Sequence, residues 1–496
     1  MLMLSHSGLQ FNKHQYDGVQ FCINREKEKE KEKDQDQDQD QDQVQEYNIR
    51  GGFILDEMGL GKTITMIGTI FANYVGTTLI VVPPILINQW YNEILRTTGH
   101  KSIIYHGPKK HNIAVDTLQN AHIVLTTYNA IHKYETRTNA LHQVKWARLV
   151  FDEAHHLRNK TKSHEGCLLL KTKIRWLITG TPIQNTIRDF YNLCRAVGIS
   201  KDFFSNAENH RIILNTFVLR RSKQEVGIYI PNINHITHSI KWTDKEEKSI
   251  AEEIHTALNT QPEKMGDLSN TLESDGKLSI MMRARQMCIY PKLLENKIEK
   301  LIQNGDIESS STYLSSIQTK SSKLDFVVKT ILENKDNENG KLVFCHYHKE
   351  MDELAQRLRR GGINNVATFD GRMTKQEKQC ALDSTTNKVL ILQIQTGCEG
   401  LNLQDKYSEI YFVSPHWNPS IEEQAIARCH RIGQKKEVTV HRFEMEGFED
   451  EDVSEDVSEE DAESKESKEP GGSKSLDEYI LDIQRNKKEI VNNMFI

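Results

Sequence analysis

The chain has 496 residues, of which 37% are hydrophobic and 27% charged, and its formal net charge is −6. This length allows two or three domains with sizeable cores, and the absence of an eighteen-residue apolar run and of a signal-peptide pattern argues against a membrane or secreted protein. The eight cysteines include no Cys-x-x-Cys pair, so we expect no zinc ribbon or RING, no disulfide framework, and a reducing intracellular compartment.

A low-complexity segment, residues 25–46, alternates Lys-Glu and then Asp-Gln, with ten acidic and five basic residues. Almost nothing in it can be buried, so we expect it to be disordered. A second acidic segment, residues 444–469, has fourteen acidic residues and two lysines. The rest of the chain then carries a net charge of +11, which suits a partner with a phosphate backbone.

A glycine-rich loop follows the first predicted strand, Phe53–Leu55. It reads Asp56-Glu57-Met58-Gly59-Leu60-Gly61-Lys62-Thr63, and a helical pattern comes next. Strand, loop, Lys-Thr and helix together predict a phosphate cradle, in which Lys62 reaches the β- and γ-phosphates and the Thr63 hydroxyl holds Mg²⁺. The strict pattern has glycine where this chain has Asp56, and a near-match of this kind also occurs in surface turns.

An acidic pair follows another predicted strand, Leu149–Phe151, within the string Asp152-Glu153-Ala154-His155. Parallel α/β sheets present catalytic residues at the carboxyl ends of their strands. We expect Asp152 to hold Mg²⁺ through a water molecule, and Glu153 to orient and polarise the attacking water. Acidic pairs alone are also common in solvated turns, but this four-residue string at a strand end favours a catalytic role.

Alternating apolar runs and helical patterns predict an α/β fold with two doubly wound parallel sheets. The expected strands of the first sheet are 53–55, 79–82, 123–126, 149–151 and 176–179, and those of the second are 342–345, 366–369, 389–393, 410–413 and 438–441. A mostly helical segment, 243–304, lies between them. We also expect a helix over His348–Arg360 and an amphipathic helix that begins near Leu476.

A basic string near the end of the second half carries Arg428 and Arg431. It follows Pro419 in a helical pattern, which would place the two arginines one turn apart on a shared helix face. Two guanidinium groups placed so can serve as arginine fingers on a γ-phosphate, although a solvated basic helix face has the same pattern. We interpret Trp417 as a packed aromatic rather than a base-stacking one, and His346 and His348 show no partner ligands for a metal.

The order of these motifs resembles that of superfamily II helicase-like motors, and within them the Swi/Snf-type DNA-dependent ATPases. The strings that carry the resemblance are residues 14–21 (HQYDGVQF), 152–159 (DEAHHLRN), 177–185 (LITGTPIQN), 395–403 (QTGCEGLNL) and 416–434, which ends in HRIGQ. Residues 284–291 and 417–419 look most similar to the DNA-repair branch, without its RING insert.

The resemblance implies two RecA-like doubly wound parallel-sheet lobes with a helical insertion between them, and hydrolysis of ATP with Mg²⁺. Gln15 would contact the adenine base above the phosphate loop, while residues 81–84, 88–90 and 125–128 would face the nucleic-acid backbone. Closure of the two lobes would bring Arg428 and Arg431 to the nucleotide. The residues expected to couple hydrolysis to DNA are Thr179, Thr181, Gln184, Gly397, Gly400, Asn402 and Gln424.

We expect five parts in the chain. They are an ATP-binding lobe (1–235), a helical protrusion and linker (236–322), a second lobe (323–443), a disordered acidic insert (444–473) and a final helix that packs back on the motor (474–496). The acidic insert has three open roles: an inert loop, a contact to histones or another basic partner, or a competitor of DNA for a basic cleft.

The implied function is ATP-dependent translocation along double-stranded DNA, with remodelling or displacement of nucleosomes or other DNA-bound proteins. A strand-separating DNA or RNA helicase and a viral transcription-associated nucleoside triphosphatase are the alternatives, and a catalytically dead scaffold is disfavoured because every catalytic residue is present. Such a protein would act in the nucleus if it is eukaryotic, or in the host cell if it is viral.

Overall fold

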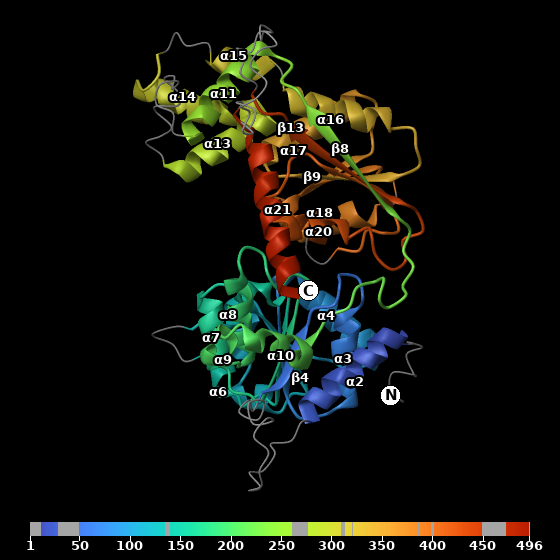
Figure 1. Cartoon of the computed structure of the whole chain (residues 1–496). Helices are drawn as coiled ribbons and strands as arrows, with labels where there is room; N and C mark the ends of the chain where they lie inside the picture. Colours follow the sequence, from blue (N-terminus) through green and yellow to red (C-terminus); the bar gives the residue numbers. More distant parts are fainter. Residues whose placement is uncertain are drawn as a thin grey trace, which may run out of the picture. The chain divides into compact units, whose positions relative to one another are not determined.

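The computed structural model describes residues 11–27, 49–133, 139–259, 276–308, 313–319, 321–384, 386–397, 401–448 and 473–495. The chain divides into two compact units, which are described one at a time. Unit 1 comprises Met1–Ile230 and Lys487–Ile496, and unit 2 comprises Pro231–Asn486. Each is built on one parallel sheet with helices around it (Figure 1).

The sheet of unit 1 has seven strands in the order β3-β4-β2-β5-β6-β1-β7, and every neighbouring pair is parallel. Successive residues of one strand enter different cores: Phe53 belongs to one hydrophobic cluster and Ile54 to another. Both faces of the sheet are therefore covered, as a doubly wound fold requires. The strands are β1 (Arg50–Ile54), β2 (Thr78–Val82), β3 (Ile103–Tyr105), β4 (Ile123–Thr127), β5 (Arg148–Asp152), β6 (Ile174–Ile178) and β7 (Val218–Leu219).

Helices connect these strands, as parallel neighbours require a crossover. They are α2 (Lys13–Lys27), α3 (Lys62–Ala72), α4 (Ile87–Thr98), α5 (Val115–Gln119), α6 (Ala140–Gln143), α7 (Lys162–Leu169), α8 (Ile187–Val197), α9 (Lys201–Ser205) and α10 (Glu208–Phe217). Short 3-10 turns follow four of the strands, at Pro84–Leu86, Pro108–Asn112, Tyr128–Ile131 and Ala154–Leu157.

The sheet of unit 2 has six strands in the order β10-β11-β9-β12-β13-β8, again parallel throughout. The strands are β8 (Ile233–Ile240), β9 (Gly340–Cys345), β10 (Val366–Phe369), β11 (Val389–Gln393), β12 (Tyr407–Phe412) and β13 (Val438–Met445). The helices around them are α16 (Ser322–Glu333), α17 (His348–Arg360), α18 (Lys375–Asp383), α19 (Ile394–Gly397) and α20 (Pro419–Ile426).

A helical layer between β8 and β9 completes unit 2. It consists of α11 (Lys245–Asn259), α13 (Lys277–Ile289), α14 (Glu295–Asn304) and α15 (Tyr313–Thr319). Its apolar residues Ile254, Met287 and Leu301 belong to the same hydrophobic cluster as Val343 of β9. The helical segment therefore shares a core with the second sheet rather than forming a separate module.

The last helix, α21 (Leu476–Phe495), has residues in both units. In unit 2, Leu476 and Ile480 enter the core, and the fully buried Asp477 pairs with the fully buried Lys323. In unit 1, Met494 joins a core cluster. Among the described residues, none of the helices has the length and apolar character to cross a membrane.

The predicted fold class is confirmed, and each of the ten expected strands overlaps an observed one. The helix over His348–Arg360 is confirmed with the same bounds. The prediction omitted the two- and three-residue strands β7 and β3, and also β8. Residues 28–48 and 449–472, which make up most of the two low-complexity segments, lie outside the described part of the chain.

A buried ion pair anchors α2 to the sheet of unit 1. Glu26 accepts hydrogen bonds from Nε and Nη2 of Arg148 (2.6 and 2.5 Å), from Trp176 Nε1 (2.8 Å) and from Asn73 Nδ2 (2.7 Å). The exposed fractions of the Glu26 and Arg148 side chains are 0% and 1%. Every acceptor position of this carboxylate is engaged, so its loss leaves a guanidinium buried without its counter-charge.

Replacing Glu26 with glutamine is therefore expected to lower the free energy of unfolding by about 3–5 kcal/mol, the usual cost of breaking a buried pair on one side. Urea denaturation followed by circular dichroism measures the change. The matched control is Glu93→Gln, which removes a helix-surface pair with Arg96 and should change stability by less than about 0.5 kcal/mol. Equal effects of the two substitutions would contradict the anchoring role.

Candidate active site

Three neighbouring strands, β5, β6 and β1, end at one edge of the sheet in unit 1. Their pairing places Ile178 level with Asp152 on one side and with Ile54 on the other. The Thr179 amide also donates to the Ile54 carbonyl (3.1 Å). The glycine-rich loop after β1, the Thr179–Gln184 string after β6 and the acidic pair after β5 are thus brought together.

The glycine-rich loop is shaped by two left-handed glycines, Gly59 (φ 93°) and Gly61 (φ 78°), which other residues adopt only with strain. The loop ends at Lys62, the first residue of α3, and Gly61 caps that helix without a side-chain hydrogen bond. Lys62 Nζ donates to the carbonyls of Asp56 (2.8 Å) and Glu57 (3.3 Å). The ammonium group therefore stands at a helix N-terminus, where backbone N–H groups favour an anion.

The string after β6 lies against this loop. A Cβ atom added to Gly180 would meet Met58 Cγ at 2.9 Å and Lys62 Nζ at 3.5 Å. A larger residue than glycine would therefore press on the phosphate loop. The backbone at Gly180 therefore packs closely against Met58 of the phosphate loop.

Asp152 is a buried carboxylate with two N–H donors. Trp90 Nε1 donates to Oδ2 (2.7 Å), the Glu153 amide donates to Oδ1 (2.9 Å), and the Tyr128 hydroxyl donates to the Asp152 carbonyl (2.7 Å). Burial, reinforced by the charge of Glu153, raises the pKa of Asp152 to about 7, while the charge of Lys62 opposes that rise. A buried carboxylate beside a phosphate-binding lysine suits Mg²⁺, which prefers oxygen ligands and would lower this pKa.

Glu153 has the one left-handed backbone among the described non-glycine residues, with φ 49° and ψ 48°. Such a conformation costs about 1–2 kcal/mol and is often retained at functional sites. His155 Nδ1 lies 3.3 Å from Glu153 Oε2 and 3.4 Å from Thr179 Oγ1. Thr179 Oγ1 accepts from the Thr181 amide (3.1 Å), and Gln184 Nε2 lies 3.5 Å from Thr181 Oγ1. A chain of polar contacts thus joins Glu153 to Gln184.

Gln15 lies against the phosphate loop, as the family resemblance led us to expect. Its side-chain oxygen accepts from the Asn12 amide (3.1 Å), and its Nε2 donates weakly to the Leu60 carbonyl (3.4 Å). A Cβ on Gly61 would lie 2.4 Å from Gln15 Nε2. The start of α2 and the phosphate loop therefore form one surface.

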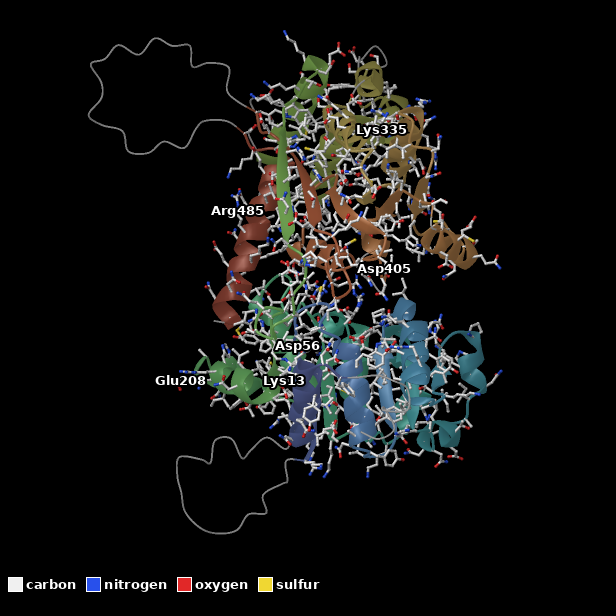
Figure 2. All side chains as sticks on the ribbon, turned by 90° about the vertical axis from the view of Figure 1, so that its right-hand side faces the viewer. Lys13, Asp56, Glu208, Lys335, Asp405 and Arg485 are labelled. Carbon is white, nitrogen blue, oxygen red and sulfur yellow. The ribbon has the colours of Figure 1, made fainter. Side chains whose placement is uncertain are left out.

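The two carboxylates at the start of the loop, Asp56 and Glu57, form ion pairs with basic side chains. Asp56, labelled in Figure 2 with Lys13 at the start of α2, pairs with Arg221, and Glu57 pairs with Lys223 Nζ (2.9 Å). Asp56 and Glu57 thus contribute ion pairs that fix the loop. Their backbone carbonyls, rather than their side chains, contact Lys62.

In unit 2, the expected helix that would carry both arginines is wrong in its extent. α20 ends at Ile426, and Arg428 and Arg431 lie in the turns that follow. The physical reason is tertiary hydrogen bonding: the Leu403 amide donates to the Arg428 carbonyl (3.1 Å), and Gln434 Nε2 donates to the Tyr407 carbonyl (3.1 Å). These bonds draw the segment away from a helical path.

The two arginines are nevertheless close to one another. Burial and the charge of Arg428 lower the pKa of Arg431, and Asp405, labelled in Figure 2, opposes this. Arg431 Nη1 donates to Asn402 Oδ1, and Arg428 Nε donates to the Gln424 carbonyl (3.2 Å). The expected coupling residues Asn402 and Gln424 therefore contact the arginines directly.

Of the two glycines expected to help in coupling, Gly397 ends α19. Gly400 lies outside the described residues. The structure thus describes one of the two glycine positions.

Of the three strings expected to face a nucleic-acid backbone, residues 125–128 and most of 81–84 are buried, whereas only Trp90 is buried in the string 88–90. Residues 125–128 are buried, and so is Trp90, because Trp90 and Tyr128 serve as donors to Asp152. The neighbouring Asn88 and Gln89 are exposed. Trp90 and Tyr128 were not predicted as supports of Asp152, and Arg221 was not predicted to belong to the site. A carboxylate at position 56, where the strict pattern has glycine, was the one sign in the sequence that a basic side chain such as Arg221 must lie nearby.

The residues set aside earlier have structural contacts. His346 lies 2.7 Å from Arg285 Nη2, and Trp417 packs against the core with Arg285 5.8 Å from its ring centre. In the part of the chain that the structure describes, no three His, Cys, Asp or Glu side chains gather as a metal site. The expected packing of Trp417 is confirmed by its contact with the hydrophobic core of unit 2.

Replacing Trp90 with phenylalanine removes the N–H donor to Asp152 while keeping an aromatic ring. Supports of metal-binding carboxylates typically change metal affinity or activity by about 10- to 100-fold. We expect the Mg²⁺ concentration for half-maximal ATP hydrolysis to rise by about this factor. The matched control is Trp146→Phe, a buried tryptophan of the same unit that donates to the Leu141 carbonyl (2.9 Å); similar Mg²⁺ curves for both variants would refute the role of Trp90.

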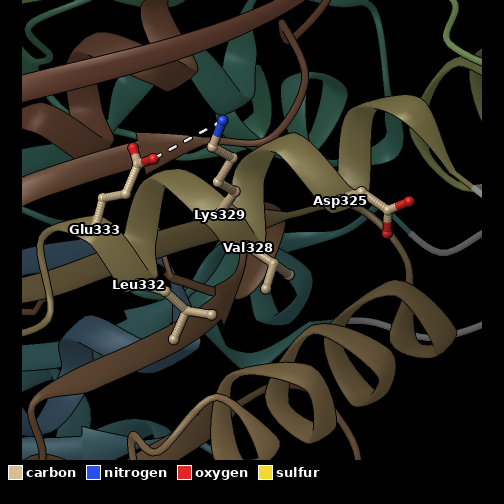
Figure 3. Close-up of a pocket in the computed structure, with 5 residues that line it drawn as sticks. All are labelled: Asp325, Val328, Lys329, Leu332 and Glu333. Atoms are coloured by element: carbon tan, nitrogen blue, oxygen red, sulfur yellow. Dashed lines mark ion pairs between the residues drawn. The ribbon is translucent and has the colours of Figure 1, made fainter.

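An open hollow of about 450 Å³ lies elsewhere, along α16 in unit 2 (Figure 3). Its lining residues are Asp325, Val328, Lys329, Leu332 and Glu333. Lys329 Nζ lies 3.9 Å from Glu333 Oε1, and Asp325 forms an ion pair with Arg357. None of the motif residues lines this hollow.

Two family models together match most of the chain. An SNF2-related domain matches residues 14–293, and a helicase conserved C-terminal domain matches residues 322–433. A "Probable global transactivator" of Orgyia pseudotsugata multicapsid polyhedrosis virus is 30% identical, with coverage of 79% of this chain and 81% of that protein. A solved structure, the Sulfolobus solfataricus SWI2/SNF2 ATPase core in complex with dsDNA, is 21% identical over 89% of each chain, with a TM-score of 0.39.

Two cellular relatives are longer than this chain. The DNA excision repair protein ERCC-6-like of Danio rerio is 26% identical and the ATP-dependent DNA helicase DDM1 of Arabidopsis thaliana is 28% identical, each over 79% of this chain. The chain spans only 33% and 56% of their lengths. This chain therefore corresponds to only part of each of these two relatives.

Proposed function

This chain belongs to the SNF2-related family of helicase-like ATPases, and on that premise we propose that it uses ATP to move along duplex DNA and to remodel or displace the proteins bound there. The observation that carries the proposal is the meeting of Lys62, Asp152 and Glu153 at one sheet edge. Such a set can bind and cleave a nucleoside triphosphate. The duplex preference rests on the family resemblance.

In the proposed reaction, ATP binds to the loop edge of unit 1. Lys62 neutralises the β- and γ-phosphates, and Thr63 and Asp152 would hold Mg²⁺, which would supply further positive charge against the phosphates. Glu153 orients the attacking water molecule and accepts its proton. Gln15 contacts the adenine base.

Arg428 and Arg431 supply the second half of the reaction. We expect closure of the two units to bring these guanidinium groups to the γ-phosphate, where they stabilise the charge that develops in the transition state. Because neither unit holds both sets of residues, hydrolysis is gated by closure. A motor needs such a gate to link each ATP to one step.

The coupling residues offer a route from chemistry to movement. In unit 1, His155, Thr179, Thr181 and Gln184 lead from Glu153 to the string beside the phosphate loop. In unit 2, Asn402 contacts Arg431. We propose that a conformational change at either end of these contacts alters the affinity for DNA.

A second candidate function is favoured by one relative. The viral protein named a probable global transactivator matches this chain over most of both lengths. A nucleoside triphosphatase that assists transcription would use the same ATP site. It would require the transcription machinery, rather than a nucleosome, as the partner.

Displacement and unwinding assays test the proposal together. A duplex carries a bound streptavidin block and a fluorescently labelled strand, and ATP is added with wild-type protein or with Lys62→Ala as the inactive control. We expect release of the block without release of the strand. Strand release from an unblocked duplex would instead support a strand-separating helicase.

The partners and the location follow from the same proposal. The protein moves along double-stranded DNA, and nucleosomes or other DNA-bound proteins are the complexes that it remodels or displaces. The protein would act in the nucleus if its source is eukaryotic, and in the host cell if its source is a virus. A relative named for chromatin remodelling supports the nuclear location, and a relative from a virus supports the host-cell location.

A further inference from the structure

The phosphate loop contains an unusual buried charge. Asp56 is 1% exposed and occupies a position where strict phosphate loops have glycine. A buried carboxylate is costly unless it is paired and hydrogen-bonded. Its partner is Arg221, 165 residues away, which donates from Nε to Oδ1 (3.0 Å) and from Nη2 to Oδ2 (2.6 Å).

The same guanidinium also holds the start of α2. Arg221 Nη1 donates to the carbonyl of His14 (2.5 Å), the residue before Gln15. A ring nitrogen of His14 lies 3.0 Å from the Leu60 carbonyl in the loop. The fork of Arg221 therefore contacts the loop with one edge and α2 with its remaining nitrogen.

Two further features fix the position of Arg221. The Leu55 amide donates to the Leu219 carbonyl (2.7 Å), and the Glu57 amide donates to the Arg221 carbonyl (2.9 Å), so residues 219–221 run beside the loop. Gly18, one turn into α2, leaves room for the guanidinium, because a Cβ there would lie 3.0 Å from Arg221 Nη2 and 2.9 Å from Thr65 Cγ2.

We infer that Arg221 is a positioning residue that fixes Gln15 over the phosphate loop and so sets the preference for adenine over guanine nucleotides. The inference rests on the proposed function, in which Gln15 contacts the base. A side-chain amide distinguishes two purines only if its donor and acceptor stand within a fraction of an ångström of the base edge. Lysine could neutralise Asp56, but it lacks the planar fork with which Arg221 donates to both Asp56 oxygens and to the His14 carbonyl.

Competition binding with three probes tests the inference: Mg²⁺·ATP, Mg²⁺·GTP and Mg²⁺·tripolyphosphate, which has no base. In Arg221→Lys we expect the ATP-over-GTP preference to fall by about 5- to 10-fold, the effect of one misplaced hydrogen bond. Tripolyphosphate affinity should stay within about 2-fold of wild type, because Lys62 and the loop remain. An equal loss for ATP, GTP and tripolyphosphate would show that Arg221 only braces the loop, and would overturn the inference.

Two further variants separate the possible failures. If Gln15→Ala keeps the wild-type preference for ATP, the base contact in the proposed function is wrong. If Gln15→Ala loses that preference and Arg221→Lys keeps it, only the inference about Arg221 is wrong. The matched control is Arg220→Lys, whose guanidinium lies 4.7 Å from the Phe495 ring centre; it should keep the preference.

Gly18→Ala tests the same point without removing the arginine, in case Arg221→Lys does not fold. The added methyl group would press on the guanidinium and on Thr65. We expect a selective loss of the ATP preference with tripolyphosphate binding retained. An unchanged preference in a folded Gly18→Ala protein, verified by its melting curve, would contradict the inference.

Discussion

Replacing Arg431 with alanine is expected to lower the maximal rate of ATP hydrolysis by about 10³- to 10⁵-fold, the range typical of an arginine finger. The side chain is anchored by Asn402, and the nearby charge of Arg428 adds to the field at the same place. The charge that these groups stabilise develops only in the transition state, so ATP binding by unit 1 should change little. Single-turnover hydrolysis and equilibrium ATP binding measure the two effects separately.

Two comparisons sharpen this prediction. Arg431→Lys keeps a positive charge but loses the planar fork, and we expect it to recover only part of the rate. Arg485→Ala removes an arginine of unit 2 that is 73% exposed and pairs with Asp482 on the helix surface, so its rate should match wild type. An Arg431→Ala rate within 10-fold of wild type would rule out the finger role.

Replacing Glu153 with glutamine is expected to lower the same rate by about 10²- to 10⁴-fold, the usual contribution of a positioned general base. Glutamine has nearly the same shape, but it cannot accept a proton from the attacking water. The His155 contact and the backbone at φ 49° hold this side chain beside Asp152. ATP should still bind, so the variant should accumulate the ATP-bound state.

Pre-steady-state measurements with radiolabelled ATP would show this as tight binding without release of phosphate. The control is Glu165→Gln, an exposed glutamate in α7 of the same unit, which should leave the rate unchanged. If Glu153→Gln hydrolyses ATP at a rate close to that of Glu165→Gln, the water-activating group is another residue.

The sequence predicted those parts of the site that lie in contiguous strings. The phosphate loop and the acidic pair each follow a short apolar strand, so a local pattern places them at the carboxyl edge of a parallel sheet. The order of the three strands β5, β6 and β1 then brings the strings together. Hydrophobic periodicity and turn chemistry located the strands and their ends, whereas the order of the strands in the sheet came from the structure.

Long-range side-chain pairs could not be predicted from the same patterns. Trp90 meets Asp152 across 62 residues, Glu26 meets Arg148 across 122, and Asp56 meets Arg221 across 165. Each pair depends on the tertiary path of the chain rather than on local spacing. Trp90 illustrates the limit, because the family resemblance placed it at the nucleic-acid backbone, whereas it is buried and donates to Asp152.

The elements that were misjudged have similar causes. The two-residue strand β7 is too short to show any alternation, although its pairing with β1 positions Arg221. α20 is shorter than its helical pattern predicts because backbone hydrogen bonds from Leu403 and side-chain bonds from Gln434 compete with the helix. Tertiary contacts overrode local propensity at the residues that carry the proposed fingers.

We propose that duplex DNA switches on ATP hydrolysis at the loop edge of unit 1. The most direct test is steady-state ATP hydrolysis measured without nucleic acid and with duplex DNA, single-stranded DNA or RNA, with Lys62→Ala as the blank. We expect strong stimulation by duplex DNA, weak stimulation by the other two polymers, and no activity of Lys62→Ala under any condition. Stimulation mainly by RNA or single strands, with none by duplex DNA, would contradict it.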